Sequence, residues 1–190
     1  IFFTNIQAAD FDPVSDILYA VATGPTAFDA TGEPWDFGQV LIAINPNTGE
    51  ADPVGHDGVL ESYAESEIGS PEQGTQILTM VYSQEADDNT SNTGSSPQFI
   101  AYDDGISRGQ FIRISVSPAA VGSAVDVVTE TIVVLTDESA RVDGLMYSAD
   151  SNDVTRLFGL NNRDIDDVGD NILVEVDLNA APDGVLTDVI

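Results

Sequence analysis

One pattern of three short apolar segments followed by a turn occurs three times along this chain. Each segment is rich in Val, Ile, Leu, Tyr and Phe and has the length of a β-strand. The first copy spans residues 6–12, 17–21 and 40–45, the second residues 77–83, 99–102 and 111–116, and the third residues 142–148, 157–160 and 173–178. A repeat of this size indicates supersecondary units that stack on one another or radiate from a centre.

Alternation within these segments predicts which faces are buried. Ile112, Ile114 and Val116 occupy every second position, which places them on one face of a strand. Residues 78–82 and 144–147 are apolar or small at nearly every position. Such composition is typical of a strand that is buried on both faces.

Turns and fourth strands complete each unit. A turn with Pro and Gly follows each third strand, at residues 45–49, 117–122 and 179–184, and a further strand is expected at residues 52–55, 125–135 and 185–190. We therefore predict an all-β fold of three tandem four-stranded antiparallel meanders, with a β-sandwich as the alternative. The units span approximately residues 6–55, 77–135 and 142–190 of a single domain, residues 1–190. A short helix from Leu60 to Glu67 is expected between the first two units.

The charge balance is extreme: 33 acidic residues stand against five basic ones, for a net charge of −28. All five basic residues are Arg. A surface this negative repels nucleic acid and anionic lipid, and it repels itself unless cations screen it. The composition favours a high-salt environment or the binding of divalent cations such as Ca²⁺ outside the cell. No apolar run approaches the roughly 20 residues of a membrane-spanning helix, so membrane insertion is not expected.

Cysteine is absent and His56 is the only histidine. Disulfides, thiolate zinc sites and cysteine nucleophiles are therefore excluded, as is a metal site with several histidines from one chain. His56 lies beside Gly55 without a nucleophile motif, so we expect no catalytic residues and no enzyme activity. An exported protein without disulfides is ordinary in a prokaryote.

The first unit carries a more specific likeness. Its segments Phe11-Asp12-Pro13, Leu18-Tyr19, Leu41 to Gly49 and Pro53-Val54-Gly55 resemble the blade pattern of secreted bacterial β-propeller repeat proteins. That resemblance implies a propeller-like arrangement of the units and an extracellular or cell-surface location. Closed propellers have roughly four to eight blades. Three units would therefore be part of a longer chain, half of a dimeric ring or an open stack.

Unclosed units leave strand edges that pair readily with another chain. We therefore predict self-association, as a homo-oligomer or with a neighbour in a filament. The terminal segments, residues 1–3 and 185–190, are the expected participants.

The loop that begins at Asp164 holds the sharpest candidate for a cofactor. Asp164, Asp166 and Asp170 lie at the spacing of a calcium loop, but Val168 replaces an oxygen ligand and Glu175 lies in a predicted strand. An EF-hand is thus excluded. A looser Ca²⁺ site from the three aspartates remains, with an ordinary acidic turn as the alternative.

Together these features predict a non-enzymatic extracellular module, structural or adhesive, that assembles through β-edges and loops while cations shield its carboxylates. The alternative function is a propeller hydrolase or lactonase with a central metal. The first strands offer only Asp10 and Asp143 toward such a centre.

Overall fold

The computed structural model describes thirteen segments of the chain. They are residues 4–23, 26–28, 34–36, 39–54, 67–69, 76–83, 97–105, 109–116, 127–136, 140–149, 155–163, 170–181 and 185–189. Every regular element within them is a β-strand.

Three antiparallel sheets follow one another along the chain. The first contains β1 (Thr4–Asp12), β2 (Ile17–Thr23), β5 (Gln39–Ile44) and β6 (Ala51–Pro53), with β7 (Glu67–Gly69) also beside β5. The middle sheet contains β8 (Ile77–Tyr82), β9 (Gln98–Asp103), β10 (Gln110–Val116) and β11 (Val127–Val134). The third contains β12 (Val142–Ala149), β13 (Thr155–Arg163), β14 (Asp170–Val176) and β15 (Leu186–Asp188). The predicted all-β class with three four-stranded meanders is confirmed.

Two local predictions were wrong. No strand was expected between the predicted segments 17–21 and 40–45, but β3 (Thr26–Phe28) and β4 (Pro34–Asp36) pair there as a small hairpin. Glu67, expected at the end of a helix, instead begins β7 and pairs with β5, while the rest of that expected helix, residues 60–66, lies outside the described residues. Neither segment shows a sustained period of two, because strands of three residues are too short to display one.

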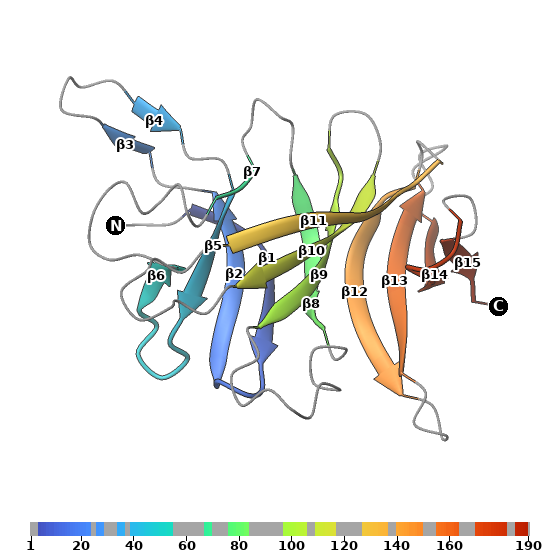
Figure 1. Ribbon diagram of the computed structural model, residues 1–190, viewed down its shortest axis with the longest axis horizontal. Coiled ribbons are helices and arrows are strands. Elements are labelled where there is room, and N and C mark those ends of the chain that lie inside the picture. The colour runs from blue at the N-terminus through green and yellow to red at the C-terminus, as the bar shows by residue number, and fades with distance from the viewer. Residues whose placement is uncertain are drawn as a thin grey trace.

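The three sheets stand side by side with the middle sheet between the others (Figure 1). The first strand of each sheet lies innermost, since β8 packs against both β1 and β12. β11 and β15 are the last strands at the opposite edges of their sheets. The order places the earliest strand of each unit beside that of the next.

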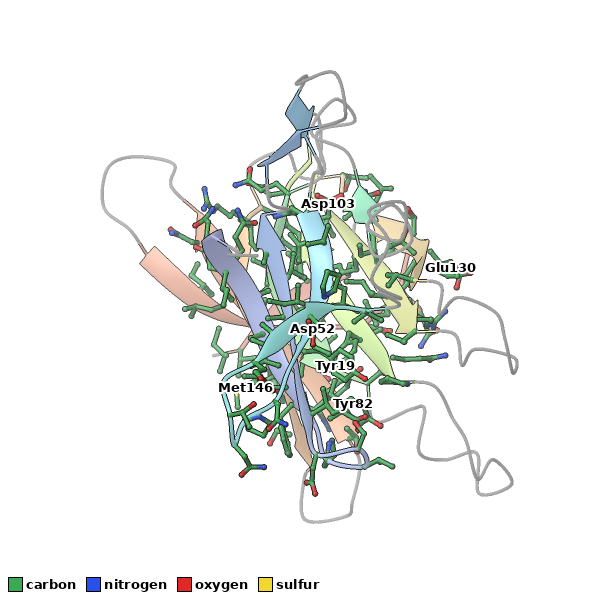
Figure 2. The ribbon with its side chains drawn as sticks, turned by 90° about the vertical axis from the view of Figure 1, so that its left-hand side faces the viewer. Tyr19, Asp52, Tyr82, Asp103, Glu130 and Met146 are labelled. Carbon is green, nitrogen blue, oxygen red and sulfur yellow. The ribbon has the colours of Figure 1, made fainter. Side chains whose placement is uncertain are left out.

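The middle sheet is buried on both faces. Ile112, Ile114 and Val116 pack in one apolar cluster with Tyr19 and Leu41 of the first sheet, as their alternation predicted. Phe99 lies in the same cluster, with its ring centroid 5.2 Å from that of Tyr19 and 5.9 Å from that of Tyr82. Figure 2 shows Tyr19 and Tyr82 toward one end of the sheets and Asp103 toward the other.

The opposite face of the middle sheet packs on the third sheet. Ile100, Tyr102 and Phe111 form a second cluster with residues that include Val142 and Val174. Residues 78–82 are thus buried on both faces as predicted. The same prediction was wrong for residues 144–147, because Met146 is 55% exposed on the outward face of the third sheet.

Polar side chains fix the first sheet to the middle one. The backbone N–H of Tyr82 donates to Oδ2 of Asp10 at 2.5 Å. The N–H of Ile77 donates to Oε1 of the buried Gln39 at 2.7 Å. Each bond joins different sheets, and a buried bond of this kind contributes about 0.5–1.5 kcal/mol to stability. Apolar burial holds the sheets together, and these bonds specify their register.

Two further bonds join the middle and third sheets. The N–H of Leu145 donates to Oγ1 of Thr79 at 3.1 Å, and the hydroxyl of Tyr102 donates to the carbonyl of Ala140 at 2.7 Å. Gly109 leaves room for that tyrosine, since a Cβ at this position would lie 1.8 Å from the Tyr102 oxygen. Gly109 is therefore required by the packing of Tyr102.

Gly159 supplies a test of packing within the third sheet, on the face that meets the middle sheet. An added Cβ would lie 2.8 Å from Cγ1 of the fully buried Val142, which must then move. We expect Gly159→Ala to lower the free energy of unfolding by about 1–3 kcal/mol, as overpacking does. Urea denaturation followed by circular dichroism measures the change. The matched control is Gly144→Ala on the neighbouring strand, where the nearest atom would be 3.8 Å away. An equal loss of stability in both variants would contradict this account.

Candidate functional site

The outer edge of the middle sheet is formed by β11, which pairs only with β10 in the described sheet order. Four consecutive side chains at its centre, from Val128 to Thr131, are exposed. Nη1 of Arg113 donates to Glu130 at 2.8 Å across the surface of this edge. An exposed ion pair contributes only about 0–1 kcal/mol, so it does little to hold the strand.

The direction of the backbone groups on β11 follows from the ladder. The N–H of Val116 donates to the carbonyl of Pro97 at 3.0 Å, on the side of β9. N–H groups alternate in direction along a strand, so the neighbouring Ser115 bonds to its β11 partner, Val128. Thr129 follows Val128 and therefore points its N–H away from β10. This edge presents backbone donors and acceptors to an incoming strand.

The two terminal segments predicted to take part in self-association, residues 1–3 and 185–190, differ in what the structure describes. Residues 1–3 lie outside the described part of the chain. Residues 186–188 form β15, which pairs with β14 and is the last strand of the third sheet. Val185 is fully buried, and the N–H of Val189 donates to the carbonyl of Leu173 at 2.9 Å. This end of the chain is therefore built into the third sheet, with one edge of β15 facing outward.

The predicted calcium loop falls largely outside the described residues. Asp164 and Asp166 lie there, and Asp170 is the first residue of β14, opposite Arg163. Elsewhere, across the segments that the structure describes, no three acidic or histidine side chains gather as a metal-binding group. The calcium site remains a prediction.

The two aspartates of the alternative hydrolase are engaged in structural bonds. Asp10 accepts from the N–H of Tyr82, and Asp143 accepts from Arg141 at 3.0 Å and from Asn162 at 3.1 Å. Asp10 thus fixes one sheet against the next, and Asp143 fixes the end of β13 to β12.

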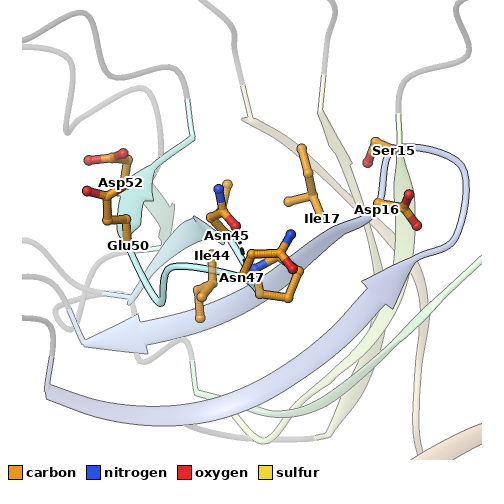
Figure 3. A pocket seen from close by; sticks show the side chains of 10 residues that line it. Ser15, Asp16, Ile17, Ile44, Asn45, Asn47, Glu50 and Asp52 are labelled. Carbon is orange, nitrogen blue, oxygen red and sulfur yellow. Dashed lines mark hydrogen bonds between the residues drawn. The ribbon is translucent and has the colours of Figure 1, made fainter.

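A cleft of about 390 Å³ opens at the turn end of the first sheet (Figure 3). Asn45 and Asn47 lie at its middle, with Asp16 on one side and Glu50 and Asp52 on the other. The N–H of Asn47 donates to Oδ1 of Asn45 at 2.9 Å, which closes an Asx turn. The lining contains no basic side chain. Its amide and carboxylate oxygens suit water and cations.

The third sheet has a similar cleft at the equivalent place. It is lined by the start of β13 and the end of β14, including Arg156, Glu175 and Asp177. Here Oδ1 of Asp177 accepts from the N–H of Asn179 at 2.9 Å, as Asn45 does in the first unit. The two clefts therefore follow from the repeated turn, and an ion pair between Arg156 and Glu175 at 3.3 Å occupies the second.

Burial controls the ionisation of groups at the joint between the middle and third sheets. Burial raises the pKa of Tyr102 far above its usual value, and the nearby Asp104 carboxylate raises it further. Burial likewise raises the pKa of Asp104, while the positive charge of Arg141 opposes the shift. The hydrogen bond to Asp143 raises the pKa of Arg141. The folded joint thus favours a neutral Tyr102.

The exposure of apolar side chains on the outward face of the third sheet was not predicted from the sequence. Met146, Leu160 and Leu173 lie there, respectively 55%, 39% and 43% exposed. The signal was present, since residues 157–160 are apolar on both sides of the strand except for a glycine. Sequence alone could not say whether a neighbour covers both sides.

Comparison with protein-family models, curated proteins and solved structures finds no match to this chain. Across the described residues no helix has the length and apolar character needed to cross a membrane.

The raised pKa of Tyr102 predicts the dependence of stability on alkaline pH. A tyrosine whose pKa is higher when folded stabilises the protein below its ordinary value near 10, and this contribution is lost as pH rises above that value. We expect the melting temperature of the wild type to fall more steeply above about pH 10 than that of Tyr102→Phe. The variant should be less stable at pH 7 by about 1–3 kcal/mol, because the carbonyl of Ala140 loses its donor. Parallel melting curves from about pH 8 to 11 would contradict this assignment.

Proposed function

We propose that this protein is a non-enzymatic structural or adhesive module of the cell exterior that assembles with further chains through its strand edges. The observation that supports the proposal most directly is the exposed edge of β11. Eight residues of extended backbone end the middle sheet there, with Val128 and Val134 exposed at 53% and 40%. An edge of this length is a template for an incoming strand.

β11 has a bulge at Ile132 and β7 lies against part of the strand, but residues 127–131 pair with β10 in regular register and lack the other protections against pairing. Natural proteins blunt such edges with lysine, proline or short strands. The chain has no lysine, β11 contains no proline, and Glu130 is its one charged residue, already paired with Arg113. Apart from Glu130, β11 consists of Val, Thr and Ile, which favour the extended conformation. These properties support assembly through β11 rather than its avoidance.

The location and family are part of the same proposal. The blade-like pattern of residues 11–55 resembles secreted bacterial propeller repeats, and the three meanders with adjacent first strands are compatible with that likeness. The absence of cysteine and lysine from an acidic chain suits a prokaryotic surface protein in a high-salt medium. Cations, including Ca²⁺, would then shield carboxylates such as those around the cleft of the first sheet.

A proline at Thr129 tests assembly through β11. Its N–H points away from β10, so Thr129→Pro removes an outward donor without removing a bond of the ladder. We expect the weight-average mass in concentrated solution, measured by light scattering, to fall at least about twofold. The matched control is Thr129→Ala, which keeps the N–H and should assemble as the wild type does. Unchanged assembly in the folded proline variant would argue against β11 as the contact.

The charge of −28 predicts a strong dependence on cations. Raising NaCl from about 0.1 M to about 1 M shortens the screening length from about 10 Å to about 3 Å, so repulsion between carboxylates falls. We expect the urea midpoint of unfolding to rise over this range.

If residues 164–170 bind Ca²⁺, calorimetric titration should show saturable heat that Asp166→Ala abolishes. Equal heats in both proteins would leave screening as the only role of the cation at this loop.

A further inference from the structure

The outward face of the third sheet occupies the place that, in the two preceding sheets, packs on a neighbour. The first sheet presents Tyr19 and Val21 of β2 to the middle sheet, and the middle sheet presents Ile100 and Tyr102 of β9 to the third. In β13, Leu157 points back toward the middle sheet. Side chains alternate along a strand, so Phe158 and Leu160 point the other way. Phe158 and Leu160 therefore lie on the face that, in the two preceding sheets, packs against the following sheet.

This face is a continuous apolar surface. Strand register places Leu160 between Gly144 of β12 and Leu173 of β14, and Phe158 beside Met146. Val189, whose N–H donates to the carbonyl of Leu173, is 42% exposed. Four of the large exposed apolar side chains of the described segments thus belong to one sheet: Met146, Leu160, Leu173 and Val189. Grouped exposure of this kind marks an interaction surface.

The other end of the stack differs. On the outward face of the first sheet, Ala20, Ala22, Val40 and Ile42 are all fully buried. A ring of two copies that placed the third sheet of each on the first sheet of the other would have to uncover them. Within the described residues, the third sheet is the end whose sheet centre remains exposed.

Charge also bears on which partner could cover the outward face of the third sheet. Two chains of net charge −28 repel each other over most of their surfaces. On or beside the outward face of the third sheet the charged side chains described are two ion pairs, Arg156 with Glu175 at 3.3 Å and Arg141 with Asp143 at 3.0 Å, together with the exposed Asp177. The face therefore carries little of the chain's net negative charge, and two copies can meet there at a low electrostatic cost.

We propose that two copies of this chain dimerise by packing the outward faces of their third sheets against each other about a twofold axis. An isologous contact buries both exposed faces at once. Sheets pack in this way, face to face, at about 10 Å separation. The inference deepens the proposed self-assembly by naming a partner and a surface, and it is independent of the β11 edge.

Sedimentation equilibrium of the full chain tests the dimer. The wild type should show a species of twice the chain mass of 20.1 kDa. Leu160→Glu buries a charge in the contact and should raise the dissociation constant of the dimer at least about tenfold. The matched control is Val14→Glu, which adds the same charge on the exposed turn between β1 and β2, away from both proposed surfaces, and should leave the dimer constant unchanged. Circular dichroism verifies that each variant is folded.

A second measurement does not depend on the stability of Leu160→Glu. The chain has no cysteine, so Leu160→Cys and Val14→Cys each carry one thiol. Reaction of the Leu160→Cys protein with a maleimide should slow severalfold as protein concentration passes the dimer constant, while the Val14→Cys protein reacts at one rate.

The outcomes separate the two proposals. Oligomers that Thr129→Pro dissolves but Leu160→Glu leaves intact would overturn the face-to-face dimer and keep assembly through β11. A dimer that Leu160→Glu weakens, with no larger species sensitive to Thr129→Pro, would support the dimer and overturn assembly through the edge. A monomer at every concentration, in low and high salt, would overturn both.

Discussion

Burial of the middle sheet on both faces is the constraint on which the rest of the structure depends. Phe99 and Ile114 pack toward the first sheet, while Ile100 and Phe111 pack toward the third, and all four are fully buried. Neither outer sheet could bury its apolar face without this layer. The chain therefore has two cores with one sheet in common, and loss of packing in the middle sheet weakens both.

Polar bonds between sheets give this stack its register. Gln39, Asp10 and Thr79 each accept a backbone N–H from the next sheet along the chain, and Tyr102 donates to a carbonyl beyond its own sheet. Apolar faces alone would slide, because burial has no preferred direction. Directional bonds between neighbouring sheets select one arrangement, and the glycines at 109 and 159 leave room for Tyr102 and Val142, which belong to the cluster between the middle and third sheets.

The acidic surface limits how such a stack can grow. At −28, a chain meets other copies only where backbone edges or neutral apolar faces outweigh repulsion, or where salt screens it. The edge of β11 offers backbone groups, and the outward face of the third sheet offers apolar area with few charged side chains. The two surfaces lie on different sheets, so both can be occupied at once. In the proposed module, the outward face of the third sheet would form dimers, and the β11 edge would join dimers into larger assemblies.

The amino-acid sequence by itself determined the strands of the three meanders and their threefold order, because period-two alternation and the Pro and Gly turn after the first meander's third strand are local signals. It also indicated that residues 78–82 are buried on both faces. Only the tertiary structure decided that residues 144–147 are not, since an apolar strand reads the same whether or not a neighbour covers it. Asp10 and Asp143 show the same limit: as sequence they are candidate ligands, and their neighbours in space make them structural acceptors. Which faces and edges remain exposed depends on how the sheets stack, and the pattern of residues within a single strand does not determine that.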